Sequence, residues 1–346
     1  MAEEPTTYRD AGVDIDAMNA AVLQMRDLAR STYTPGVLTD IGSFGGMYAA
    51  DFAHMREPVL VSSIDGVGTK LMVANLVGKH DTVGMDLVAH CANDILVQGA
   101  RPLFFLDYFA TGKLSPGIVV DVVKGVAEGC RSVGCALLGG ETAELPGLYP
   151  EGEYDLAGCI VGVVERSRIV DGSQVMPGDA VVGLASNGLH TNGYSLARHV
   201  LFDLNGLTIH DTPVMLSGAS LGEVLLTPHR CYTHSILTLM DEMEIKGMAH
   251  ITGGGFYDNV PRILPADCSV TVDRRNWVIP PIFTLIQQLG NVPDPEMFRV
   301  FNMGIGFVII VERDQGLNAI ERLRELGETA YLIGEVYRGP HEVDVL

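Results

Sequence analysis

Short apolar runs alternate with amphipathic stretches along most of the chain. Four β-branched or aromatic runs in the first half predict strands: residues 59–64, 103–109, 136–138 and 155–164. Two stretches between these runs, residues 80–97 and 117–133, carry apolar residues at three- to four-residue spacing. That spacing puts the apolar side chains on one face of a helix, so it predicts two helices packed on a sheet.

The same alternation continues in the second half. It predicts a strand at 180–185, helices near 193–204 and 229–243, a strand at 269–272 and a terminal strand-helix-strand from 304 to 337. Between the halves lies "VDGSQVMPGD" (170–179), which is rich in turn-forming residues. We therefore predict two α/β domains, residues 1–170 and 171–346.

Composition narrows the class of protein. A chain of 346 residues with 47% hydrophobic and 19% charged residues is long enough for two globular cores. Its longest apolar runs, such as "FVIIV" (307–311), are strand-sized, so we expect no membrane span. The start "MAEEPTTYRD" lacks a signal-peptide pattern, and the six cysteines form no C-x-x-C pair. These features favour a cytoplasmic protein with free thiols.

The acidic balance also excludes a class of partner. A net charge of −20 argues against nucleic acid, which is bound mainly by Lys and Arg. Small phosphorylated ligands remain compatible with it, because backbone N–H groups and carboxylate-held metals bind phosphate whatever the net charge.

Glycine is concentrated in six clusters rather than spread evenly. They are "DIGSFGG" (40–46), "DGVGTK" (65–70), "LGGETAELPG" (138–147), "SNGLHTNGYS" (186–195), "TGGGF" (252–256) and "NMGIGF" (302–307). Glycine lets the backbone approach a ligand closely. One cluster alone is most often a turn, but several beside carboxylates at strand ends indicate a phosphate-rich site. "DGVGTK" is not a Walker A loop, which requires G-x-x-x-x-G-K-[ST].

Carboxylates accompany these loops. Asp65 ends a predicted strand, and Asp94 lies in a largely apolar helix, one turn from His90. Oxygen ligands suit Mg²⁺, and an aspartate in an apolar helix is costly without a role. For Asp86 and Glu144, a helix-capping or solvated role is equally compatible with the sequence. We interpret Asp65 as a metal ligand, Gly66 and Gly68 as turn residues under phosphate, and Lys70 as reaching the anion.

Seven long motifs resemble those of a known enzyme family. They are "YRDAGVDIDAMN", "VSSIDGVGTKL", "HDTVGMDLVAHCANDILVQGARPLFFLDYFATGKL", "GGETAELPGLY", "SNGLHTNGYSL", "HITGGGFYDNVPRILP" and "FNMGIGF". Together, and in this order, they resemble the aminoimidazole ribonucleotide (AIR) synthetases, or phosphoribosylformylglycinamidine cyclo-ligases. The resemblance implies that formylglycinamidine ribonucleotide and ATP give aminoimidazole ribonucleotide, ADP and phosphate, with Mg²⁺ required. It also implies a homodimer in which the sheets of two N-terminal domains close a shared barrel.

The resemblance assigns roles to the loops. It implies ATP or phosphate binding by Gly45, Gly46, Asp65, Gly66, Gly68, Thr69, Lys70, Gly139 and Gly140. Metal would be held by Asp65, Asp94 and Glu141, with Asp86 a weaker fourth. Substrate binding falls to Asn187, Gly188, His190, Asn192, Gly193 and to Thr252, Gly253, Gly254 and Gly255.

Three residues are expected to carry the chemistry: His190, Asp94 and Lys70. His190 would polarise the formyl oxygen or move a proton, since imidazole titrates near neutrality. His250 is a second-rank candidate, and His199, His210 and His229 are treated as ordinary histidines.

The sequence departs from the family pattern at three places. Arg26 stands where the family usually has lysine, Ser43 where it has glycine, and Phe307 where it often has methionine. Arg26 keeps the charge but replaces a point ammonium with a planar fork, so an essential lysine role there is in doubt.

Related ATP-dependent proteins are the alternatives. Selenophosphate synthetase typically has Cys or selenocysteine in its N-terminal glycine loop, whereas the first cysteine here is Cys91. Thiamine-monophosphate kinase and a hydrogenase maturation factor lack "SNGLHTNGYSL" in this form. Formylglycinamidine synthetase is far longer or needs partner subunits. A non-catalytic nucleotide-binding protein of this fold would be expected to have lost Asp94 or His190.

Overall fold

The computed structural model describes residues 15–346, so the first fourteen residues of the predicted N-terminal domain, with part of the motif "YRDAGVDIDAMN", lie outside it. Four strands form the first sheet, in the order β1-β4-β2-β3: β1 (Pro58–Gly66), β2 (Arg101–Thr111), β3 (Ala136–Glu144) and β4 (Tyr154–Glu165). Each contains one predicted run. β3 extends well past the predicted 136–138, through "GGETAE". The strand was not predicted there because its two glycines are uncommon in strands.

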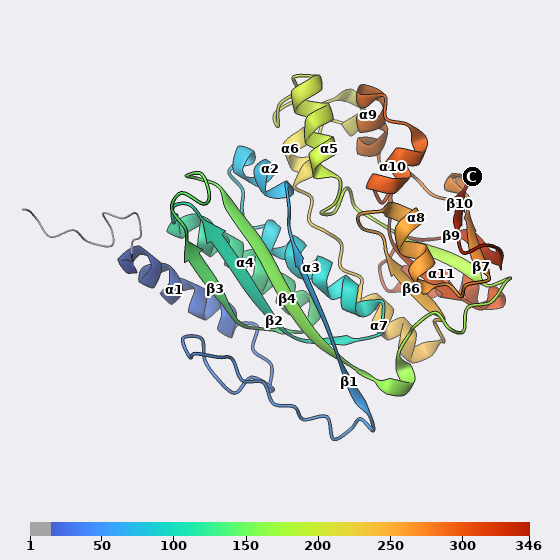
Figure 1. Ribbon diagram of the computed structural model, residues 1–346, viewed down its shortest axis with the longest axis horizontal. Helices are drawn as coiled ribbons and strands as arrows, with labels where there is room; N and C mark the ends of the chain where they lie inside the picture. Colours follow the sequence, from blue (N-terminus) through green and yellow to red (C-terminus); the bar gives the residue numbers. More distant parts are fainter. Residues whose placement is uncertain (1–14) are drawn as a thin grey trace, which may run out of the picture.

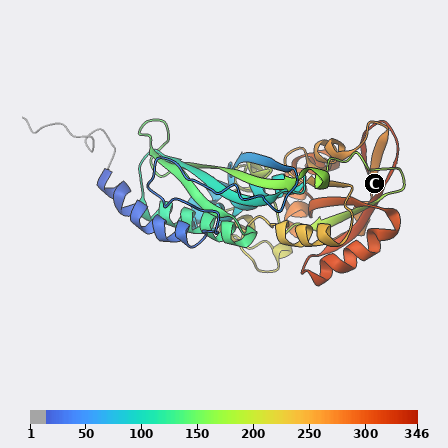
Figure 2. The ribbon, with the colours of Figure 1, turned by 90° about the horizontal axis from the view of Figure 1, so that it is seen from below.

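Helices cover one face of this sheet. They are α1 (Ile15–Arg30), α3 (Val83–Leu96) and α4 (Pro116–Val133), and Figure 2 shows them on the same side of the strands. α4 begins with a proline in its first turn and ends at Gly134 in the left-handed conformation, a common start and stop. The short helix α2 (Lys70–Val77), which the sequence pattern did not predict, follows β1 directly.

The opposite face of the first sheet carries exposed apolar side chains. Leu60 and Ile64 on β1 are 62% and 74% exposed, and Leu106 and Tyr108 on β2 are also exposed. Alternate positions on β2, such as Phe105 and Phe109, are buried beneath the helices. Within the described part of the chain, helices therefore cover one face of the N-terminal sheet and leave these apolar side chains of the other face exposed.

The second sheet has six strands, in the order β10-β7-β9-β5-β8-β6. They are β5 (Ala180–Ala185), β6 (Gly247–His250), β7 (Cys268–Val272), β8 (Ile305–Val311), β9 (Ala330–Arg338) and β10 (Val343–Val345). Every residue of β8 is buried, as its continuous apolar run predicts for a strand covered on both faces. Helices α7 (Thr233–Glu242) and α11 (Gly316–Glu325) lie on one face, and α8 (Gly255–Asn259), α9 (Pro281–Gly290) and α10 (Asp294–Val300) on the other (Figure 1).

Two predicted helices differ in detail from the observed ones. The predicted helix near 193–204 is α5 (Tyr194–Arg198), continued by one π-helical segment (His199–Leu204). The predicted helix at 229–243 begins only at Thr233, because the first domain holds residues 229–232 in an irregular path: Asp86 and Asn93 accept the backbone N–H groups of His229 and Tyr232.

Two α/β units built on separate sheets confirm the predicted fold class. β4 ends at Glu165 and β5 begins at Ala180, and the predicted boundary at 170/171 lies between them. Within residues 15–346, no helix has the length and apolar character that a membrane span requires.

Candidate active site

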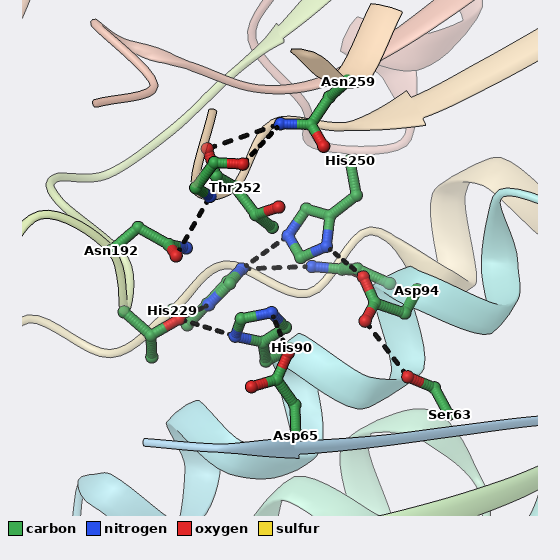
Figure 3. Close-up of polar contacts among 12 residues, drawn as sticks. Ser63, Asp65, His90, Asp94, Asn192, His229, His250, Thr252 and Asn259 are labelled. Atoms are coloured by element: carbon green, nitrogen blue, oxygen red, sulfur yellow. Dashed lines mark hydrogen bonds and ion pairs between the residues drawn. The ribbon is translucent and has the colours of Figure 1, made fainter. Parts of the chain in front are cut away.

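His90, His190, His229 and His250 cluster with Asp65 and Asp94 where the two domains meet, and Figure 3 labels all of these except His190. Asp65 comes from β1, His90 and Asp94 from α3, and His250 from the end of β6, while His190 and His229 come from loops of the second domain. The structure thus brings the predicted residues Asp65, Asp94 and His190 into one cluster. It also places His250 and His229 at the centre, although His250 was predicted only as a second-rank candidate and His229 as an ordinary histidine.

Hydrogen bonds join most of the cluster into one chain. Asp65 Oδ2 lies 2.9 Å from His90 Nε2, and His90 Nδ1 lies 2.7 Å from Thr191 Oγ1. Thr191 Oγ1 is in turn 3.3 Å from His229 Nδ1. A doubly protonated His90 donates at both ring nitrogens, which leaves the Thr191 hydroxyl free to donate to His229.

The chain continues to the second aspartate. His229 Nε2 lies 3.0 Å from His250 Nε2, and His250 Nδ1 lies 2.9 Å from Asp94 Oδ1. Ser63 Oγ donates to the other oxygen of Asp94 at 3.1 Å. Neutral His229 and His250 with an ionised Asp94 satisfy these contacts, because each imidazole then donates once and accepts once.

The pKa shifts agree with this protonation pattern. Burial lowers the pKa of His90, but the hydrogen bond and charge of Asp65 outweigh it and raise the pKa. Burial raises the pKa of Asp65, yet the contact with His90 brings it below its usual value. For His250, burial lowers the pKa despite the opposing charge of Asp94. The raised pKa of His90 favours an ion pair with Asp65, and the lowered pKa of His250 favours its neutral form.

His190 occupies an unusual position within the cluster. Its backbone is left-handed at φ 61°, its side chain is 1% exposed, and its ring stacks on His229 with centroids 4.0 Å apart. Both ring nitrogens are buried without a hydrogen-bond partner among the described residues. Burial, with the nearby positive charge of Lys70, holds its pKa well below the usual value. His190 is thus a neutral imidazole with a free donor and a free acceptor.

Close packing keeps the His190 ring in this place. Gly306 lies against it, and a Cβ at Gly306 would come within 2.5 Å of His190 Cε1 and 2.3 Å of the Tyr232 hydroxyl. Gly306, the second glycine of "MGIGF", is therefore required by the close approach of the Tyr232 hydroxyl and the His190 ring.

Among residues 15–346, two groups of three side chains come close enough to share a metal ion: His190, His229 and His250, and His90, Asp94 and His250. The rings of His190 and His229 are nearly parallel, at 22°, so their in-plane lone pairs do not converge on one point. The first group does not fit an ion as it stands. Asp65 and Asp94, which retain 39% and 30% side-chain exposure, are better placed as oxygen ligands.

Lys70 and Asp86 have a different setting from the predicted one. The Lys70 ammonium is fully buried and lies 2.8 Å from both carboxylate oxygens of Asp86. It also donates to the backbone carbonyls of Thr227 and His190, at 2.8 and 3.3 Å. An ammonium has three protons, and these three acceptors use them. In this structure Lys70 does not face a phosphate site, and Asp86 does not face a metal site.

The remaining residues of "DGVGTK" lie beside the cluster. Gly66 N–H donates to Asp65 Oδ1 at 2.7 Å, and Gly68 is left-handed at φ 69°. The Thr69 hydroxyl lies 3.2 Å from that of Ser195 in α5. This loop therefore contacts the second domain next to the histidines.

The predicted substrate loops also meet. Asn192 Oδ1 accepts the N–H of Gly253 at 3.1 Å, and Asn259 Nδ2 donates to the carbonyls of Thr252, Gly253 and Gly255 (Figure 3). Gly255 is left-handed, and a Cβ there would lie 1.8 Å from a backbone oxygen of α10, so only glycine fits. The turn at 252–255 is thus fixed against the histidine loop.

The other predicted substrate residues shape these two loops. Gly188, Gly193 and Gly254 all have positive φ, and Asn187 donates its side-chain amide to the Pro228 carbonyl at 2.7 Å. Asn302 in turn donates to the Gly188 carbonyl at 2.9 Å. These contacts shape the loop and engage the Asn187 donor internally.

The other predicted phosphate residues gather elsewhere. Gly45, Gly46, Gly139, Gly140 and Glu141 line a hollow of about 400 Å³ between the 40–46 loop and strands β2 and β3. Three strand spacings separate Asp65 on β1 from Glu141 on β3, roughly 14 Å. Within one chain, Glu141 therefore does not join Asp65 and Asp94.

Asp107 lines this hollow as well, although the sequence reading gave it no role. It shares a row of the sheet with Asp65 and Gly140, and a Cβ at Gly140 would meet its carboxyl at 2.1 Å. Burial raises the pKa of Asp107 to about 7. Arg26 lies close by and donates to the Ile41 carbonyl at 3.4 Å, so the arginine contacts the glycine loop.

Family models match both domains. Residues 48–164 match the N-terminal domain of AIR synthase related proteins, and residues 176–346 match their C-terminal domain. The chain belongs to this family. The predicted resemblance is thus confirmed.

Curated relatives share most of the sequence. The chain is 54% identical over 336 residues to the phosphoribosylformylglycinamidine cyclo-ligase of Trichlorobacter lovleyi, covering 97% of this chain and 96% of that protein. It is 55% identical to the protein of the same name from Geotalea daltonii, with the same coverage.

Solved structures of low identity share the fold. Thiamine-monophosphate kinase from Stenotrophomonas maltophilia superposes with a TM-score of 0.69 at 17% identity, covering 93% of this chain and 95% of that one. The hydrogenase maturation protein HypE in complex with ATP gives 0.63 at 17% identity, covering 92% and 88%.

Proposed function

We propose that this protein is a phosphoribosylformylglycinamidine cyclo-ligase. It converts formylglycinamidine ribonucleotide and ATP to aminoimidazole ribonucleotide, ADP and phosphate, the fifth step of de novo purine synthesis. The observation that carries the proposal is the 54% identity to curated cyclo-ligases over 97% of the chain. The matched region covers nearly the whole chain, and so includes both domains.

The reaction makes clear demands on the site. The formyl oxygen is a poor leaving group until it is phosphorylated; the amidine nitrogen then attacks the same carbon and phosphate leaves. Phosphoryl transfer depends mainly on positioning and charge neutralisation. The protein must therefore hold two anionic ligands in line and remove protons from nitrogen.

Asp65 and Asp94 are our candidates for holding Mg²⁺ with the nucleotide. Both carboxylates are partly exposed. Asp65 lies 2.9 Å from His90, and the ligand atoms of His90 and Asp94 lie within 4.8 Å of each other, so the two carboxylates are near neighbours. Mg²⁺ supplies charge neutralisation to the phosphates when it is bound. His90 and His250 orient the two carboxylates through the hydrogen bonds described above.

His190 acts on the formyl group in this scheme. A neutral imidazole donates a hydrogen bond from one nitrogen and accepts a proton at the other. Because its pKa is held low, the imidazole is uncharged at neutral pH before it acts on the formyl group. The turn at 252–255 and the loop at 187–193 lie beside this imidazole and would bind the ribose phosphate.

The glycine-lined hollow near Glu141 is our proposed further part of the nucleotide site. It contains Gly45, Gly46, Gly139 and Gly140, whose backbone can approach a ligand closely. The exposed apolar face of the first sheet supports a homodimer, because a monomer rarely leaves such a face in water. We place the enzyme in the cytoplasm, where the substrates of nucleotide synthesis occur.

A direct assay tests the function. Purified protein is supplied with formylglycinamidine ribonucleotide, ATP and Mg²⁺, and the aromatic amine of the product and ADP are both measured. Equal amounts of the two products are expected. ADP formed without the amine, or only with thiamine monophosphate or selenide as acceptor, would replace the proposal with one of the related activities.

A further inference from the structure

A buried ion pair holds the histidine cluster together across the domain boundary. Lys70 and Asp86 belong to α2 and α3 of the first domain, and both side chains are fully buried. Their partners lie in the second domain: Lys70 donates to the carbonyls of His190 and Thr227, and Asp86 accepts the backbone N–H of His229 at 2.6 Å.

The three contacted backbone groups place two of the site imidazoles. His190 has the left-handed backbone, which costs energy in a non-glycine residue and persists only where its surroundings impose it. His229 stacks on His190 and is the central link of the hydrogen-bonded chain. Fixing the carbonyl of one and the N–H of the other fixes the stacked pair relative to α3, which carries His90 and Asp94.

Stability alone does not explain such a pair. Removing two charges from water costs about as much as their mutual attraction returns, so buried ion pairs are often replaceable by neutral residues without loss of stability. A neutral side chain cannot reproduce the hydrogen-bond geometry of the lysine. One ammonium donates at once to a carboxylate and to two backbone carbonyls.

We propose that Lys70 and Asp86 are positioning residues that lock His190 and His229 of the second domain onto α3 of the first. They act through the backbone of the histidine loops and do not touch phosphate or metal. This inference rests on the proposed function for its kinetic consequence, since it predicts that losing the lock slows turnover by misplacing His190.

The test uses the full-length protein with a double variant, Lys70→Met and Asp86→Asn. Methionine keeps the length of the side chain without charge, and asparagine keeps an acceptor for the His229 N–H. No unpaired charge is left buried, so this variant folds more readily than either single one.

A second buried pair provides a matched control. Lys246 lies 2.7 Å from Asp179, the two side chains are 9% and 5% exposed, and Asp179 also accepts a backbone N–H, from Met176 at 2.8 Å. The control double variant, Lys246→Met and Asp179→Asn, makes the same chemical changes in a pair that contacts none of the cluster histidines.

Two readouts are recorded for both variants: steady-state kinetics with each substrate varied, and the imidazole carbon-proton resonances of the ten histidines. A misplacement of about 1 Å typically costs about 100-fold in rate, so we expect kcat of the first variant to fall by about that factor. KM values and Tm should stay near those of the wild type. The His190 and His229 resonances should shift, while the control variant changes neither readout.

Three results would overturn the proposal. One is a kcat within about threefold of wild type. Another is a rise in the KM for ATP at unchanged kcat, which would return Lys70 to phosphate binding. The third is a parallel loss of kcat and Tm in both double variants, which would make the pair merely structural. If the wild type itself forms no aromatic amine, the proposed function fails, and the resonances still decide whether the lock exists.

Discussion

Asp107 gives a quantitative prediction about stability and pH. Its carboxyl lies on the helix-covered face of β2, between the buried side chains of Phe105 and Phe109, and burial raises its pKa from 3.8 to about 7. Below pH 3.8 both the folded and the unfolded protein hold this proton. Between about 4 and 7 the folded protein binds it and the unfolded protein does not, so stability falls as pH rises through this window. Above pH 7 the folded protein has also lost the proton, and the full destabilisation by the buried charge of Asp107 is present.

The magnitude follows from the shift. Each pKa unit corresponds to about 1.4 kcal/mol, so a displacement from 3.8 to about 7 corresponds to a cost of up to about 4 kcal/mol at pH 8. Asp107→Asn keeps the shape and removes the charge. The variant should therefore gain stability over wild type by about 1.4 kcal/mol per pH unit across the window, and by a constant amount above it.

The assay is urea unfolding of both proteins from pH 4 to 8.5, followed by far-ultraviolet circular dichroism. Tryptophan fluorescence would report on the wrong domain, because the single tryptophan, Trp277, lies in the second one. The exposed Asp155 of the same sheet provides the control: Asp155→Asn should change stability by less than about 0.5 kcal/mol. A stability difference for Asp107→Asn that does not vary between pH 4.5 and 7.5 would refute the reasoning.

Three further predictions concern the site and the assembly. Asp65→Asn or Asp94→Asn should abolish turnover at ordinary Mg²⁺ while leaving the circular dichroism spectrum intact, because losing even an outer partner of a metal costs about 10–100-fold in affinity; near-normal activity would remove these carboxylates from the metal site. His190→Ala should lower kcat and kcat/KM together by about 10²–10⁴-fold, whereas a pure rise in KM in both His190→Ala and His190→Asn would make it a binding residue. Sedimentation at micromolar concentration should show a dimer that Ile64→Glu, on the exposed sheet face, converts to monomer; a wild-type monomer would contradict the shared barrel.

Periodicity predicted most of the fold because the elements have clear faces. The strand at 180–185 was predicted to the residue, and the run at 307–311 lies within the fully buried β8. The short strand β6, "GMAH", was not predicted, because four residues with one glycine show no alternation of apolar and polar positions. β3 was cut short because its glycines are untypical of strands.

The site was predicted in part, and the errors of that prediction share a cause: contacts between residues far apart in the sequence. Asp65, Asp94 and His190 stand in long motifs, and the structure gathers them. His229 stands in "TPHRCY", where nothing local distinguishes it, and it joins the site only because Asp86, 143 residues away, accepts its N–H. Lys70 looked like a phosphate ligand because a glycine loop precedes it, and the sequence could not show that α3 buries its ammonium.

The hydrogen-bonded chain of the site also bears on how this protein can evolve. It leaves the first domain at His90, passes through Thr191, His229 and His250 of the second, and returns at Asp94. Suppose that a gene exchanged one half with a distant family member. The residues at the two ends of the hydrogen-bonded chain would then come from one parent, and the residues in its middle from the other. Each half therefore constrains substitutions in the other, and the linker between them is a poor place for recombination, however cleanly it separates the two sheets.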